Sequence, residues 1–184
     1  MFEIERTENM RKIAFLLILI LGSVILVSCG DKEQVADEII KYYNEEWIPI
    51  NSFKKDNLGE LTDEFIELDS KEDKSEAIQM LNNEIMPIVE EVINKLENVE
   101  PENNNVEKIN DLQLEAENFS LESFENTIEY YNDNLTESEL EEDKQKLDSM
   151  YDDVIEYQNK VFKKYDLKKS NEKIGDFNKL VKEE

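Results

Sequence analysis

The chain has 184 residues, which is enough for one domain and a targeting segment but too few for two domains and a linker. Its 46 Asp and Glu residues outnumber 21 Lys and Arg residues, and the resulting formal charge of −25 repels a nucleic-acid backbone. The chain has no His and one Cys, which excludes Cys/His zinc sites, His-dependent nucleophiles and an intrachain disulfide.

The N-terminal segment has the layout of a signal peptide. Residues 13–27 carry no charge and follow Arg11 and Lys12. A helix of these fifteen residues is about 22 Å long, shorter than a hydrocarbon core of about 30 Å, so cleavage is favoured over a permanent span. The first nine residues carry three Glu residues, which oppose the basic leader that a signal needs. We therefore expect Met10 to be the true start.

Four residues at the end of this segment resemble the lipobox of bacterial prolipoproteins: Leu26, Val27, Ser28 and Cys29. The resemblance implies that a diacylglyceryl lipid is attached to the Cys29 sulfur and that a signal peptidase cuts between Ser28 and Cys29. Two acyl chains hold a protein stably at a membrane, whereas one chain holds it marginally. The alternative is an ordinary Cys in an apolar helix. No other cofactor is predicted.

Apolar periodicity predicts a helical domain after the signal. The first helical region, 35–68, contains Pro49 and Gly59, and we expect it to be kinked or broken there. Apolar residues spaced three or four apart then predict helices over 78–99, 106–131 and 140–165. No stretch alternates in the manner of a strand.

The segments between these helices are short and polar. Ser75 is expected to cap the second helix, Pro101 ends it, and Thr136 with Glu139 forms a capping box for the fourth. Short connections predict an all-α fold, an elongated antiparallel up-down-up-down bundle of about four helices preceded by a cleaved signal helix. The expected organisation is a signal peptide at 1–28, a lipidated tether at 29–34, the bundle at 35–167, and a Lys-rich tail or short helix at 168–184.

Two segments echo each other. Residues 44–50 read NEEWIPI and residues 82–88 read NNEIMPI, and they share Asn, Glu, Pro and Ile in register. A duplicated helical hairpin and chance resemblance in a helical sequence of low complexity are both open explanations.

Three further features have two interpretations each. Tyr42, Tyr43 and Trp47 form a possible aromatic surface for a glycan or peptide, or they close a thin bundle core, which is the commoner use. Residues 132–138 offer alternate oxygens, but they lack the glycine and closing Glu of a calcium loop, so capping is favoured and no metal site is predicted. The lysines of residues 160–169 suit anionic lipid or wall polymer, and they equally suit a helix C-terminus, which is favoured.

The overall pattern resembles the small helical lipoproteins of low-GC Gram-positive bacteria, including those described as cell-wall binding. The resemblance implies a lipid-anchored module on the extracytoplasmic face of the cell membrane, with no catalytic residues, that binds wall polymer or another envelope protein. One alternative is that residues 21–28, LGSVILVS, are released as a pheromone-like octapeptide. Another is an enzyme with a carboxylate-based site.

Overall fold

The computed structural model describes residues 31–70 and 73–183, so the signal peptide and the lipobox, including Cys29, lie outside the described residues. After an α-helical stretch at 31–42, the elements are η1 (Tyr43–Trp47), α2 (Ile48–Ser70), α3 (Lys74–Met80), η2 (Leu81–Ile85), α4 (Met86–Glu97), α5 (Asn104–Tyr131), α6 (Glu137–Lys164), β1 (Leu167–Ile174) and β2 (Phe177–Lys182). In this part of the chain, no helix combines the length and apolar character needed to cross a membrane.

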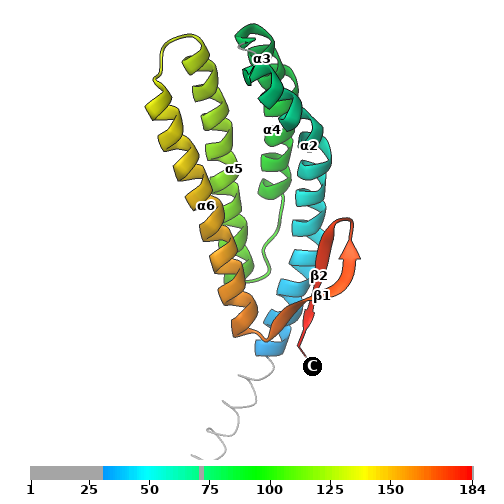
Figure 1. Cartoon of the computed structure of the whole chain (residues 1–184). Coiled ribbons are helices and arrows are strands. Elements are labelled where there is room, and N and C mark those ends of the chain that lie inside the picture. The colour runs from blue at the N-terminus through cyan, green and yellow to red at the C-terminus, as the bar shows by residue number, and fades with distance from the viewer. Residues whose placement is uncertain (1–30, 71–72, 184) are drawn as a thin grey trace, which may run out of the picture.

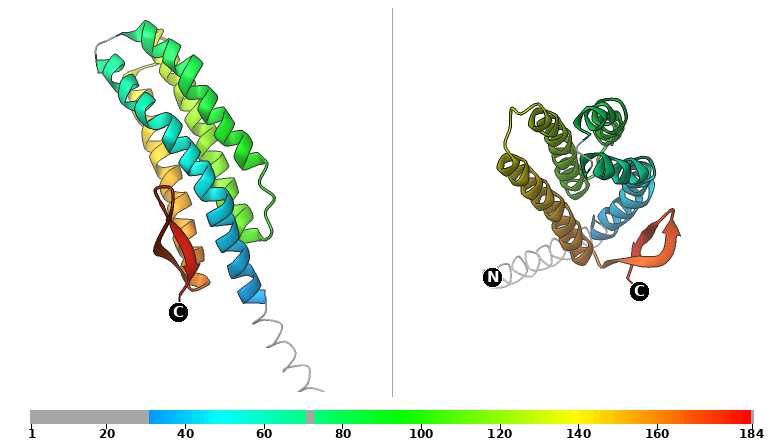
Figure 2. Two further views of the ribbon diagram at one scale, coloured as in Figure 1. Left: turned by 90° about the vertical axis from the view of Figure 1, so that its right-hand side faces the viewer. Right: turned by 45° about the horizontal axis from the view of Figure 1, so that its top comes forward.

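The helices form an elongated antiparallel bundle (Figure 1). In chain order, α2 packs on α4, α4 on α5, and α5 on α6. The predicted mostly helical bundle is confirmed in this outline. We call the end that holds residue 31, the loop at 98–103 and the end of α6 the base, and the opposite end, with the α5–α6 loop, the tip (Figure 2).

The helices that contain Pro49 and Pro87 both change their hydrogen-bond register shortly before the proline. The Ile48 N–H donates to the Tyr43 carbonyl five residues earlier, and the Met86 N–H donates to the Leu81 carbonyl in the same way. Each π-helical turn ends two residues before a proline, whose missing N–H and bulky ring disfavour an ordinary α-turn. The NEEWIPI and NNEIMPI echo therefore encodes one local structure twice.

The expectation of a break at Gly59 is wrong, because α2 runs through this residue to Ser70. A Cβ at Gly59 would meet no heavy atom within 4 Å, so the position is open to solvent and imposes no turn. Glycine weakens a helix by only about 1 kcal/mol, which the rest of the helix can outweigh. At Pro49 the register changes without ending the helix.

The helix ends are capped largely as the sequence indicates. Thr136 and Glu139 form the predicted capping box, and Asn103 accepts backbone hydrogen bonds at the start of α5. The expected cap at Ser75 is wrong, because the side chain of Asp73 accepts from the Glu76 N–H and the helix begins at Lys74. Asp is an equally good N-cap, and the chain offers it two positions earlier.

A β-hairpin replaces the tail or short helix expected at 168–184, and it corrects the expectation that the chain has no strand. The antiparallel strands β1 and β2 are joined at Gly175, which has a positive φ of 58°. The hairpin lies along the first helix, where the Asn44 side chain both donates to the Leu180 carbonyl and accepts from the Leu180 N–H, each at 2.9 Å. These contacts satisfy a sheet edge and fix the hairpin to the bundle.

The largest apolar cluster lies at the base. It joins the 31–47 helix, the start of α5, the end of α6 and the hairpin, through residues that include Ile39, Tyr43, Ile109, Phe162 and Leu180. A second cluster near the tip joins α2, α3, η2 and α5 around Leu81 and Tyr131. Every buried residue of α6 lies at or after Val154, so the first half of this helix buries no side chain.

Candidate functional site

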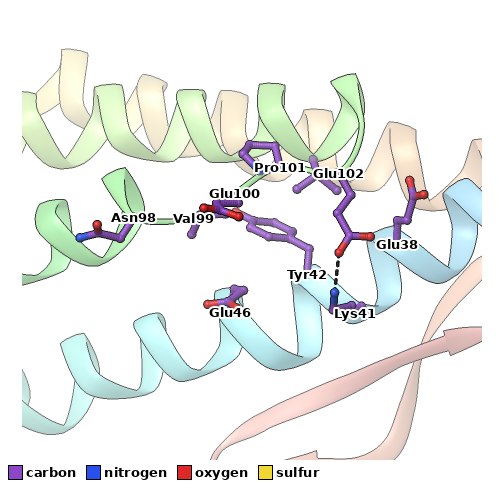
Figure 3. Close-up of a pocket in the computed structure, with 10 residues that line it drawn as sticks. Glu38, Lys41, Tyr42, Glu46, Asn98, Val99, Glu100, Pro101 and Glu102 are labelled. Atoms are coloured by element: carbon purple, nitrogen blue, oxygen red, sulfur yellow. Dashed lines mark hydrogen bonds and ion pairs between the residues drawn. The ribbon is translucent and has the colours of Figure 1, made fainter.

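A concave region at the base lies between the first helix and the loop that precedes α5 (Figure 3). Its volume is about 470 Å³. The helix contributes Glu38, Lys41, Tyr42 and Glu46, which face the loop across the cavity. The lining residues on the other side are Asn98, Val99, Glu100, Pro101, Glu102 and Val106.

A second cavity of about 570 Å³ adjoins the first one, and Glu46 and Asn98 line both cavities. It lies between α2 and α4, and its lining includes Ile50, Phe53 and Lys95. The Lys95 ammonium lies 4.7 Å from the centre of the Phe53 ring. We call the two cavities together the base groove. It is long enough to span several turns of the first helix.

The base groove carries excess negative charge. Lys41 forms an ion pair with Glu102, and this hydrogen bond raises the pKa of the Lys41 ammonium. Glu38 accepts a hydrogen bond of 2.9 Å from the Asn103 side chain. Within the described part of the chain, Glu46 and Glu100 have neither a hydrogen bond nor an ion pair. Two carboxylates are therefore free to meet a cation.

An exposed aromatic surface, the less favoured of the two interpretations, is wrong for two of its three residues. Tyr42 and Tyr43 are only 5% and 2% exposed. The Tyr42 hydroxyl lies 3.3 Å from Asn110 Oδ1, to which it donates, and burial raises the pKa of this hydroxyl. Burial likewise raises the pKa of Tyr43 to about 12. The interpretation as bundle core is the correct one for both residues.

Trp47, the third aromatic residue, is half-buried beneath the hairpin. Its ring stacks on Tyr43 with centroids 4.7 Å apart, and it meets the Phe177 ring edge to face at 5.5 Å. The cluster thus fastens the hairpin to the π-helical turn. It offers no aromatic platform to a sugar.

A polar triad around one buried carboxylate, which the sequence analysis did not predict, joins α2, α5 and α6. The Lys54 ammonium donates to both carboxylate oxygens of Glu117 at 2.8 Å and lies 2.7 Å from the Tyr151 hydroxyl. Glu117 is completely buried. Burial opposes the charged form of Lys54, but the neighbouring Glu117 outweighs it and raises the Lys54 pKa.

The triad has the properties of a structural link between helices. Burial, together with the Glu117 charge, raises the pKa of the Tyr151 hydroxyl, whereas a poised base needs a pKa near the working pH. Lys54 occupies both oxygens of Glu117, so neither oxygen is presented to a substrate. Glu117 sits one residue after the apolar Ala116, and no sequence signal distinguishes it from the exposed acids of the same helix.

The loop at 132–138 is used for capping. Asp133 adopts a positive φ of 62°, and Lys74 lies 3.5 Å from its carboxylate. The Asn134 side chain donates to Glu129 at 2.7 Å. Among residues 31–70 and 73–183, no group of three or more Asp, Glu or Cys residues is arranged to hold a metal ion.

The lysines of residues 160–169 divide between two elements. Lys163 and Lys164 lie in the last turn of α6, where they complement the helix dipole as expected. Lys168 and Lys169 lie on β1.

No family model matches this chain, and neither curated proteins nor solved structures show a significant similarity to it.

Proposed function

We propose that this protein is a lipoprotein anchored through Cys29 to the extracytoplasmic face of the cell membrane, where it acts as a non-enzymatic binding module. The lipobox-like residues support the anchor. The described helix begins at residue 31, two positions after Cys29, and two residues span at most about 7 Å. A lipid on Cys29 would therefore place the base of the bundle against the membrane surface.

The ligand site of this module is the base groove, and its ligand is an extended cationic chain such as a Lys-rich peptide. The observation that carries this assignment is the pair of unpaired carboxylates, Glu46 and Glu100, on opposite walls of one cavity. A bound amine would exchange its water shell for charge-assisted hydrogen bonds.

The second cavity extends the site for a longer ligand. Phe53 lines this cavity, and the Lys95 ammonium lies over its ring. An aromatic face next to carboxylates suits a further cationic side chain, because cations are attracted to the ring. The length of the base groove favours a chain with several amines over a single small cation.

The anchor is tested by Cys29→Ser in the producing cells. This variant has no thiol for the thioether, so we expect an uncleaved precursor that lacks the lipid. Mass spectrometry of the membrane fraction measures both properties. A mature chain of normal length that still partitions into detergent would contradict the anchor.

The base groove is tested with the full chain in detergent and a fluorescent tetralysine peptide. We expect binding that weakens about tenfold for each of Glu46→Gln and Glu100→Gln, because each removes one charged contact. Tetraglutamate controls for peptide length, and Glu137→Gln with Glu141→Gln at the tip controls for net charge. Equal losses in the groove and tip variants would show that only the overall charge attracts the peptide.

A further inference from the structure

A third cavity at the base has the opposite charge to the rest of the molecule. Its volume is about 500 Å³, and it lies where the end of α6 meets the start of β1. Three of its lining residues are lysines, Lys163, Lys168 and Lys169. The remaining lining residues are Asn159, Phe162, Asp166, Leu167 and Glu183.

These three lysines are exposed, and none of them forms an ion pair with a carboxylate of residues 31–70 or 73–183. Eight other lysines of the chain form ion pairs within the described residues: Lys32, Lys41, Lys54, Lys55, Lys74, Lys95, Lys179 and Lys182. In the same part of the chain, none of the six lysines from Lys160 to Lys173 forms one. Lys108, Lys144 and Lys146 also form no ion pair among the described residues, so the lysines of this cavity are distinguished by lying together and not by being unpaired.

One of the two acids that line the cavity has a cationic partner, and the three lysines outnumber both acids. Asp166 forms an ion pair of 2.8 Å with Lys32, and its carbonyl accepts from the Glu183 N–H. The Lys169 ammonium lies 5.7 Å from the centre of the Tyr43 ring, a contact that leaves its charge uncancelled. The cavity thus presents net positive charge to solvent.

The cavity lies at the end of the molecule that the proposed anchor would place at the membrane. The Lys32–Asp166 pair connects the cavity wall to the first described turn of the chain, beside the proposed anchor. The tip, which is strongly acidic, lies about 42 Å away along the 28 residues of α5. This separation is far beyond a screening length of about 8 Å, so the tip charge does not weaken attraction at the base.

We propose that the cavity lined by Lys163, Lys168 and Lys169 binds the phosphate group of an anionic phospholipid in the membrane that carries the protein. This inference rests on the proposed lipid anchor. A single diacylglyceryl group leaves the bundle free to tilt. Contact between the lysines and headgroups would hold it upright, with the acidic tip pointing away from the membrane.

The test is amine acetylation of the full lipidated chain reconstituted into vesicles, read by mass spectrometry at each lysine. Phosphatidylglycerol vesicles are compared with phosphatidylcholine vesicles, with and without added inorganic phosphate. We expect about fivefold slower acetylation of Lys163, Lys168 and Lys169 on phosphatidylglycerol only. This protection should disappear in 1 M NaCl, where the screening length is about 3 Å. Lys144 and Lys146 at the tip, which also lack ion pairs within the described residues, serve as matched controls.

Three results would overturn the inference. Equal protection on both lipids would mean that the membrane merely shields the base, and no protection on either would mean that headgroups do not enter the cavity. Protection by inorganic phosphate but not by phosphatidylglycerol would assign the cavity to a soluble phosphate. Flotation of the chain with phosphatidylcholine vesicles reports the anchor separately: failure to float contradicts the anchor and this inference together, whereas flotation without protection overturns the inference alone.

Discussion

The base and the tip of the bundle are built from the same helices but are held together differently. At the base, the first helix, α6 and the hairpin enclose an apolar cluster around Tyr43 and Leu180. Toward the tip, α2 buries no side chain after Ile50, and α6 buries none before Val154. The tip is also the more acidic end, since residues 56–84 and 118–148 each contain ten acidic residues and two lysines. The base therefore rests on the larger apolar cluster, whereas at the tip the smaller cluster around Leu81 and Tyr131 holds the helices together against charge repulsion.

The Lys54–Glu117–Tyr151 triad lies at the boundary between these two ends, and breaking it should have an effect as large as that of any single truncation in the core. Lys54→Ala leaves the Glu117 carboxylate buried without its cation, so we expect a loss of about 3 kcal/mol in the free energy of unfolding. Urea denaturation followed by circular dichroism measures this loss.

The pH dependence and a double variant complete this prediction. The Lys54 pKa is raised by folding, so its contribution is fully present below the ordinary lysine value of about 10.4 and is lost as the pH rises through the higher folded value. Lys54→Met with Glu117→Leu should recover most of the lost stability, because no charge remains buried. A double variant as unstable as Lys54→Ala would mean that the helices need the ion pair itself.

Matched truncations compare the two kinds of packing directly. Leu96→Ala removes a completely buried side chain next to Val92 and Ile50 and should cost about 3 kcal/mol. Leu147→Ala removes a half-buried side chain from the first half of α6 and should cost about 1 kcal/mol or less. Thermal unfolding of both variants measures the difference. Similar costs at the two sites would show that the tip is packed as tightly as the interior around Leu96.

Salt should change the tip more than the base, although the effect is the smallest of the three. Exposed carboxylates on neighbouring helices repel one another, and ions at 0.15 M limit this repulsion to about 8 Å. We expect amide hydrogen exchange in the first half of α6 to slow as NaCl is added, while amides near Leu180 change little. Faster exchange at the tip with salt would mean that attractive lysine pairs dominate there.

Much of the helical architecture can be predicted from this sequence because its helices are long and regular. Apolar spacing locates α5 and α6 within a few residues, and the Thr136 capping box marks the start of α6. The hairpin is harder to find, because β1 has only two apolar residues in eight and shows no alternation. Its only clear signal is Gly175 followed by Asp176 between Ile174 and Phe177, a pattern typical of a two-residue turn.

The candidate sites depend on contacts between residues that are far apart in the sequence, which no local sequence pattern reveals. Glu46 and Glu100 are separated by 54 positions and meet only because α4 returns antiparallel to the first helix. The triad likewise joins residues on three helices, and each of them looks like a surface residue in its own segment. Composition does predict that acids will line most cavities. The lysine run at 160–169 does point to a local excess of positive charge, but it does not show that Lys163, Lys168 and Lys169 line one cavity.

The π-helical turn before Pro49 has a consequence for how one helix serves two partners. Each residue of an α-helix advances by about 100°, so one extra residue in a turn rotates everything that follows by that amount. Upstream of the turn, Ile39 faces the cluster shared with the hairpin, and downstream of it Ile50 faces α4. The extra residue thus works as a phase adjustment that redirects the apolar stripe from one neighbour to the next. Deleting a single residue from Tyr43–Trp47 would keep the helix intact and aim its second half at the wrong partner.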